Sequence, residues 1–172
     1  MPKNEKEFVA QPPSAVQAKP AKDYYKRNLP HYQVEGRPIF ITFNTYQRWE
    51  LPESIRHLVI KHCLYDHGKK ILLHGIVVMS DHVHMILTPL NDKEGRPFGL
   101  AEIMNGIKGA SAHSINKALG RKGHVWQDES FDHILRSDVS IMSKVEYICE
   151  NPVRKGMTKK GCNNHKLYGT EY

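Results

Sequence analysis

The sequence His82-Val83-His84 lies in a stretch of the 172-residue chain that is typical of a β-strand. Successive side chains of a strand point to opposite faces of a sheet, so His82, His84 and Ile86 share one face. The apolar residues between them point to the other face, where they can be buried: Val83, Met85 and Leu87. The segment therefore requires a sheet with a packed core on one side and a polar surface on the other.

Two imidazoles on one face of a strand can bind the same metal ion. The same spacing also arises by chance in a chain with 11 histidines, and such side chains then only pack. The motif by itself leaves both interpretations open.

Hydrophobic periodicity and turn residues predict the order strand, helix, strand, strand, helix, strand, helix. Strands are expected at residues 38–46, 71–79, 82–87 and 131–136, and helices at about 52–67, 100–119 and 138–151. This order predicts an α+β fold, a ferredoxin-like βαββαβ antiparallel sheet with an added C-terminal helix. Pro152 is expected to end that last helix.

The chain is long enough for one domain with a proper core. Residues 1–36 are polar and interrupted by prolines, which predicts a flexible N-terminal arm; residues 37–156 form the expected domain and 157–172 a basic tail. No apolar run approaches the length of a membrane span, and the N-terminus lacks the apolar core of a signal peptide. We therefore expect a cytoplasmic, nucleoid-associated protein without a membrane partner.

The three cysteines lack the paired spacing of a zinc knuckle and their number is odd, which argues against a disulfide framework. Cys63 and Cys149 are expected to be small core residues. A net charge of +7 and a pI of about 9.3 favour a polyanionic partner, because lysine and arginine release counterions from phosphates on binding. Solubility alone could also explain this charge.

The last predicted helix presents two neighbouring stripes. Ile141, Val145 and Ile148 recur at helical spacing and are expected to be buried. The second stripe contains Lys144, Tyr147 and Asn151, in which Tyr147 and Asn151 are one turn apart. A tyrosine at such a flank is either a half-buried packing residue or, with a phosphate held in line, a nucleophile.

Several motifs in this order resemble those of the single-tyrosine HUH transposases (IS200-like), specifically the REP-associated tyrosine transposase branch. The resemblance extends over about residues 38–156. It is carried by His82-Val83-His84, Val125-Trp126-Gln127, Asp132-His133-Ile134-Leu135-Arg136 and Tyr147-Ile148-Cys149-Glu150-Asn151-Pro152-Val153. The C-terminal residues 166–172 do not match the tryptophan- and serine-containing ending that is common in the family.

The resemblance implies a metal-dependent enzyme that nicks and transfers single-stranded DNA, with REP-like hairpins as its substrate. It implies that His82, His84 and Asn151 bind Mg²⁺ or Mn²⁺ and that Tyr147 is the nucleophile, forming a 5′-phosphotyrosine. Related insertion-sequence enzymes are dimers, whereas the REP-associated branch need not be, so the sequence leaves monomer and homodimer open.

A single strand is expected to lie on the sheet face, with basic side chains near its backbone. The candidate phosphate contacts are Lys108, Arg121, Lys122, Arg136, Arg154 and Lys155. Trp126 and Phe131 are expected to belong to the core rather than to stack on bases.

Two other classes of function fit the same residues. In one, the chain is a non-catalytic nucleic-acid-binding module, in which the histidines and the tyrosine merely pack or stack. In the other, it is a metal-dependent phosphoesterase acting on small substrates with water as the nucleophile.

Overall fold

The computed structural model describes residues 36–159, so all but the last residue of the N-terminal arm predicted at 1–36 and most of the tail predicted at 157–172 lie outside the described residues. The elements follow in the predicted order: β1 (Ile39–Thr45), α1 (Glu53–Tyr65), β2 (Ile71–Val78), β3 (His82–Pro89), α2 (Leu100–Ala118), β4 (Trp126–Ile134) and α3 (Asp138–Arg154). A short 3-10 turn, η1 (Tyr46–Arg48), follows β1.

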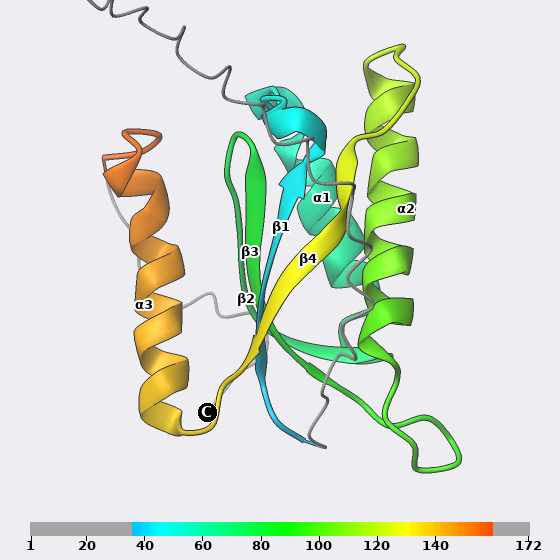
Figure 1. The fold of residues 1–172 in the computed structure, drawn as a ribbon, viewed down its shortest axis with the longest axis vertical. Coiled ribbons are helices and arrows are strands. Elements are labelled where there is room, and N and C mark those ends of the chain that lie inside the picture. The colour runs from blue at the N-terminus through cyan, green and yellow to red at the C-terminus, as the bar shows by residue number, and fades with distance from the viewer. Residues whose placement is uncertain (1–35, 160–172) are drawn as a thin grey trace, which may run out of the picture.

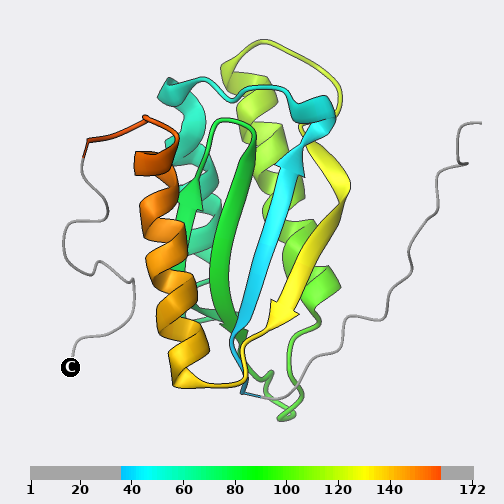
Figure 2. The same cartoon turned by 60° about the vertical axis from the view of Figure 1, so that its left-hand side comes forward.

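The four strands form one antiparallel sheet in the order β2-β3-β1-β4. Helices α1 and α2 cover one face of this sheet, and α3 lies on the other (Figures 1 and 2). This is the ferredoxin-like α+β arrangement with an added C-terminal helix, so the predicted fold class is confirmed.

The main core lies between the sheet and helices α1 and α2. Alternate residues of the central strands point into it, namely Ile39, Ile41 and Phe43 of β1 and Val83, Met85 and Leu87 of β3, all at most 1% exposed. The helices contribute their apolar stripes, including Cys63, which is fully buried. The alternation predicted for both strands is therefore confirmed.

A smaller apolar cluster fixes α3 against the other face. Its buried members are Phe40, Ile86, Leu135, Val145 and Ile148, and Cys149 packs at its margin. Helix α3 begins with a capping box, in which the backbone N–H of Ser140 donates to the Ser137 hydroxyl and that of Ser137 to the Ser140 hydroxyl. The principal contacts of α3 are with β2 and β3, so much of the sheet face over β1 and β4 is left without a helix.

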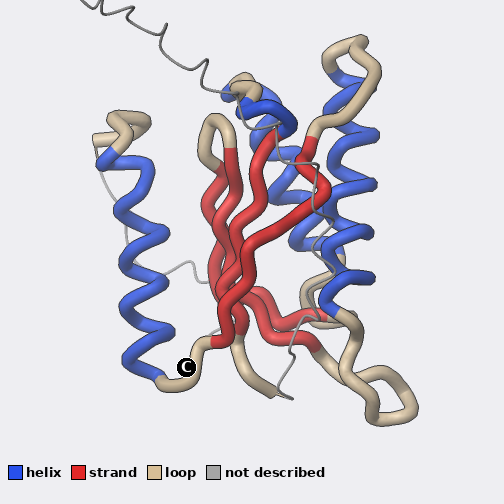
Figure 3. The backbone as a smooth tube through the Cα atoms, viewed as in Figure 1, coloured by secondary structure: helices blue, strands red, loops and turns tan. Residues whose placement is uncertain are grey.

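Two predicted boundaries were wrong by more than two residues. Helix α3 continues through Pro152 to Arg154, because a proline in the last turn disturbs only the carbonyl four residues earlier and little helix follows it. Strand β4 begins at Trp126 instead of residue 131 (Figure 3), and its first half carries the polar run Gln127-Asp128-Glu129-Ser130. That run lies beside a bulge, where the pairing register with β1 shifts between Phe43 and Thr45.

Candidate active site

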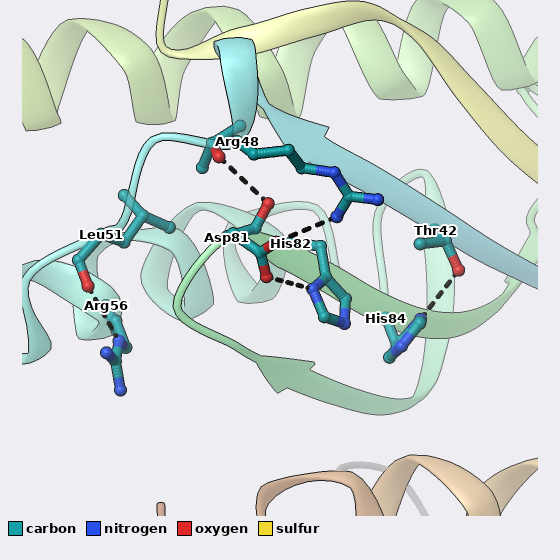
Figure 4. Close-up of polar contacts among 8 residues, drawn as sticks. Thr42, Arg48, Leu51, Arg56, Asp81, His82 and His84 are labelled. Atoms are coloured by element: carbon teal, nitrogen blue, oxygen red, sulfur yellow. Dashed lines mark hydrogen bonds and ion pairs between the residues drawn. The ribbon is translucent and has the colours of Figure 1, made fainter. Parts of the chain in front are cut away.

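The two histidines of β3 project from the face of the sheet on which α3 lies. Their rings are 4.7 Å apart between centroids, and Figure 4 shows both imidazoles on the same side of the strand. His84 is 6% exposed and its side chain lies between β3 and α3, while His82 is only partly exposed at the end of the strand. The shared face predicted for His82 and His84 is confirmed.

Each imidazole is held by a hydrogen bond at the same ring nitrogen. His82 Nδ1 lies 2.6 Å from Asp81 Oδ1, and His84 Nδ1 lies 2.7 Å from Thr42 Oγ1 on the neighbouring strand. When each Nδ1–H donates to its oxygen partner, Nε2 carries the free lone pair. Both rings can therefore offer Nε2 to a common ligand, an arrangement that is typical of histidines that bind metal ions.

Asp81, in the turn before β3, is itself held in place by residues at the end of β1 and in η1. The Arg48 guanidinium donates to Asp81 Oδ2 at 3.0 Å, and the N–H and hydroxyl of Thr45 both donate to the Asp81 carbonyl. Burial opposes ionisation of Asp81, but the hydrogen bond with His82 and the charges of His82 and Arg48 outweigh it, so its pKa is lowered. Asp81 is thus an ionised acceptor that orients His82.

Burial lowers the pKa of His84 to about 4, and the positive charges of His82 and Lys144 contribute to the same effect. His84 is therefore neutral near pH 7. A neutral imidazole is the form that can bind a metal ion.

Tyr147 of α3 lies directly against this pair. Its ring centroid is 5.6 Å from that of His84 and 6.2 Å from that of Phe40, and 37% of the residue is exposed. The Tyr147 ring is therefore packed on its inner side while part of the side chain meets solvent. A phenol held in this way can reach a phosphate bound beside the histidines.

Asn151 lies one helical turn beyond Tyr147, towards the end of the sheet at which His82 lies. Helix α3 runs antiparallel to β3, and four helical residues advance about 6 Å while two strand residues advance about 6.6 Å. If Tyr147 is level with His84, Asn151 is level with His82. Among residues 36–159 the buried side-chain Nδ2 of Asn151 has no hydrogen-bond partner. The amide oxygen and nitrogen can exchange places by a flip, so the oxygen could take this position and bind a cation.

The donor set fits a divalent cation in part. Two neutral imidazole nitrogens and one amide oxygen are suitable for Mn²⁺, whereas Mg²⁺ prefers oxygen ligands and would keep several waters here. Among residues 36–159 no group of three histidine, cysteine, aspartate or glutamate side chains could hold a metal ion, so a third protein ligand at this site would have to be of another residue type, such as the Asn151 amide.

Three further residues at the site were not identified from the sequence: Thr42, Asp81 and Lys144. The ammonium of Lys144 lies 4.9 Å from the centroid of the Phe40 ring and 5.3 Å from that of Tyr147. Its charge faces the space in which a phosphate beside Tyr147 would lie. The position of Lys144 on the stripe of Tyr147 and Asn151 was the one signal that could have identified it.

The six predicted phosphate contacts do not gather in one patch. Arg154 and Lys155 end α3, at the same end of the molecule as the loop after α2 that carries Arg121 and Lys122 (Figure 1). The Arg121 guanidinium stacks 4.0 Å above the Trp49 ring, and Arg154 forms an ion pair with Glu150. Arg136 follows β4 at the opposite end. Their contacts with DNA stay a prediction.

Lys108 is not the surface cation that its sequence position indicated. It is 9% exposed, and its ammonium donates to the carbonyls of Gln127, Asp128 and Glu129 at 2.9, 3.0 and 3.4 Å. The aliphatic part of the side chain lies along the apolar stripe of α2 while the charge reaches the bulge of β4. Lys108 therefore stabilises the edge strand, on the face away from the histidines.

Comparison with known proteins identifies the family to which this fold and these residues belong. The family described as "Transposase IS200 like" matches residues 40–151, a span that contains both histidines, Tyr147 and Asn151. The chain belongs to the IS200-like transposases. It is thus a member of a family of enzymes, which confirms the resemblance that the sequence motifs indicated.

Individual REP-associated tyrosine transposases are similar to this chain over half of its length or more. The REP-associated tyrosine transposase of Escherichia coli K12 is 25% identical over 132 residues, which are 75% of this chain and 74% of the relative. A protein of Haemophilus influenzae named a putative REP-associated tyrosine transposase is 22% identical over 87 residues, about half of each chain. A solved structure of a REP-associated tyrosine transposase bound to a REP hairpin is 25% identical and superposes with a TM-score of 0.56, covering 80% of this chain and 76% of that one.

Among residues 36–159 no helix is both long and apolar enough to cross a bilayer. Cys63, buried in the main core, is a free thiol.

Proposed function

We propose that this chain is a metal-dependent endonuclease and strand transferase for single-stranded DNA, acting through a 5′-phosphotyrosine at Tyr147. The observation that carries the proposal is the packing of the Tyr147 ring 5.6 Å from the ring of His84. The nucleophile Tyr147 is then on α3, and the histidines that would hold the metal ion are on β3. Because these two elements face each other, both can act on the same phosphate.

The residues divide the chemistry between them. The Tyr147 oxygen attacks the phosphorus and loses its proton, the bond from phosphorus to the 3′ oxygen breaks, and that oxygen takes up a proton as a free 3′-hydroxyl. His82, His84 and Asn151 would hold Mg²⁺ or Mn²⁺, which when bound polarises the scissile phosphate. Lys144 adds a fixed positive charge beside the same phosphate.

The covalent intermediate conserves the energy of the phosphodiester. A second 3′-hydroxyl can attack the phosphotyrosine, which rejoins the strand and releases the Tyr147 oxygen with a proton. Strand transfer then needs no external energy source.

The similarity to REP-associated tyrosine transposases, one of which was solved with a REP hairpin, supports a hairpin with an unpaired flank as the substrate. The net charge of +7 is consistent with a nucleic-acid partner. We expect the protein to act in the compartment that holds the chromosome.

The histidines provide the test. A labelled hairpin taken from the flanks of the gene is incubated with Mn²⁺ and wild type, His82→Ala or His84→Ala, and nicking and binding are measured in parallel. Either substitution should abolish nicking and leave hairpin affinity nearly unchanged, because contacts to the phosphates supply most of that affinity. Nicking that persists in both variants or in EDTA would remove the metal from the mechanism.

A further inference from the structure

Phe131 of β4 is a large exposed aromatic side chain on the face of the sheet that carries the histidines. The residue is 62% exposed, although its sequence context predicted a core residue. It pairs with Thr42 across β1 and β4, and Thr42 pairs in turn with His84 across β1 and β3. Directly paired residues point to the same face, so Phe131, Thr42 and His84 lie in one row across three strands.

This row leads away from the part of the sheet that α3 covers. Thr42 hydrogen-bonds to His84, and two strand spacings separate Phe131 from His84 by about 10 Å. The principal contacts of α3 are with β2 and β3, so β4 stands at the open side of the site (Figure 2). A strand with its scissile phosphate beside Tyr147 and His84 can continue over β1 towards Phe131.

The surroundings of Phe131 suit a base better than a phosphate. On the same face β4 presents His133, which pairs with Phe40, while Asp132 pairs with Ile41 and so points to the face that α1 and α2 cover. An exposed ring offers a flat apolar surface, which every base can use through its own ring face. Core packing does not explain an aromatic residue at position 131, because the ring is mostly exposed to solvent.

We propose that Phe131 is a stacking platform for one unpaired base of the DNA strand, next to the nucleotides bound at Tyr147. The inference rests on the proposed function and adds to it a defined base subsite on the edge strand. Lys108 supports this subsite from the opposite face, because its ammonium binds the carbonyls of the bulge that precedes Phe131.

The test uses full-length protein and synthetic oligonucleotides: a hairpin with unpaired flanks, the same hairpin with blunt ends, and an unstructured single strand. Phe131→Ala should bind the flanked hairpin and the single strand about tenfold to a hundredfold more weakly, the range that base–aromatic stacking reaches, and the blunt hairpin as well as wild type does. Phe131→Trp should restore binding, because the indole also stacks.

The matched control is Tyr65→Ala. Tyr65 is 69% exposed at the end of α1, on the other side of the sheet, so its loss should leave all three affinities unchanged. An abasic nucleotide moved through the flanks should locate the stacked base, because at one position it should weaken binding by wild type and have no further effect on Phe131→Ala.

Two results would overturn the platform. One is equal binding of all oligonucleotides by wild type and Phe131→Ala, and the other is an equal loss on blunt and flanked hairpins. These results are distinct from failure of the proposed function, which would appear as the absence of nicking by wild type. If wild type does not nick DNA, weaker binding of the single strand by Phe131→Ala would still support the platform.

Discussion

A hydrogen bond at Nδ1 decides which nitrogen of an imidazole can bind a cation. At His84 this bond involves the hydroxyl of Thr42, 2.7 Å away on β1, and at His82 it involves the carboxylate of Asp81. Partners of this kind fix both the orientation of the ring and its tautomer, and their loss typically weakens metal binding or activity about 10- to 100-fold. Thr42 is therefore a positioning residue for His84.

Thr42→Val should lower the rate of metal-dependent nicking about 10- to 100-fold, because valine retains the shape of threonine but cannot hold His84 Nδ1. The difference in nicking rate between Thr42→Val and wild type should become smaller as the Mn²⁺ concentration is raised. Thr42→Ser should retain most of the wild-type rate. A nicking assay over a Mn²⁺ titration makes the measurement. A rate for Thr42→Val equal to that of wild type would show that Thr42 does not position the histidine.

The lowered pKa of His84 predicts how stability depends on pH. Because the pKa falls to about 4 in the folded chain from its ordinary 6.5, the unfolded chain binds more protons between these values. The contribution of His84 to stability therefore rises with pH from about 4 to 6.5 and is constant above. His84→Asn should lessen the loss of stability on acidification in metal-free urea unfolding, whereas His113→Asn, at an exposed position on α2, should not.

At the level of residues, the sequence was sufficient to place His82 and His84 on one face, because side-chain alternation within a strand is local. It was not sufficient for Thr42, whose contact with His84 spans 42 residues and depends on the register between β1 and β3. Phe131 was placed in the core, because a large aromatic residue in a strand is more often buried than exposed. On an edge strand without a covering helix it is not.

Among the elements, β4 depends most on a single distant side chain. Three consecutive carbonyls of its first half accept hydrogen bonds from the Lys108 ammonium, which offsets the pairing lost at the bulge. The polar run at 127–130 has little strand propensity, which explains why the sequence predicted a shorter strand.

Lys108→Met should lower the free energy of unfolding by about 1–3 kcal/mol, because the stem of the side chain is kept while the partly buried carbonyls of residues 127–129 lose their donor. Burial lowers the pKa of Lys108 to about 8, so the cost of the charge partly offsets this contribution. Urea unfolding at pH 7 makes the measurement, with Lys117→Met, at an exposed position on the same helix, as the control. Weaker DNA binding by Lys108→Met at unchanged stability would instead support the phosphate contact predicted from the sequence.

Helix α3 was predicted nearly in full, because its start is marked by Ser137 and its faces follow from helical periodicity. The end of α3 was not predicted correctly, because a proline disrupts a helix strongly only where several turns of the helix follow it. The stripe of Lys144, Tyr147 and Asn151 was also predicted. Its contact with β3 could not be predicted, because that contact depends on the order of the strands in the sheet.

For the whole molecule, the excess of positive charge predicts the salt dependence of binding. A hairpin with unpaired flanks should bind more tightly than the same sequence as a perfect duplex, because the open sheet face and Tyr147 reach only a single strand. If three phosphates are neutralised, affinity should fall about 20-fold between 50 and 200 mM salt. Filter binding over a salt series makes the measurement, and equal affinity for hairpin and duplex throughout would contradict the account.

The covalent joining of Tyr147 to DNA tests the central claim most directly. Wild-type protein and a hairpin labelled at its 3′ end, incubated with Mn²⁺, should give a labelled band that resists SDS, because the adduct carries the nucleotides on the 3′ side of the nick. Tyr147→Phe, which removes only the hydroxyl of a partly exposed ring, should fold normally and give no such band. Mass spectrometry should assign the adduct to Tyr147. A band that persists in Tyr147→Phe, or an adduct that maps to Tyr46 or Tyr65, would contradict the account.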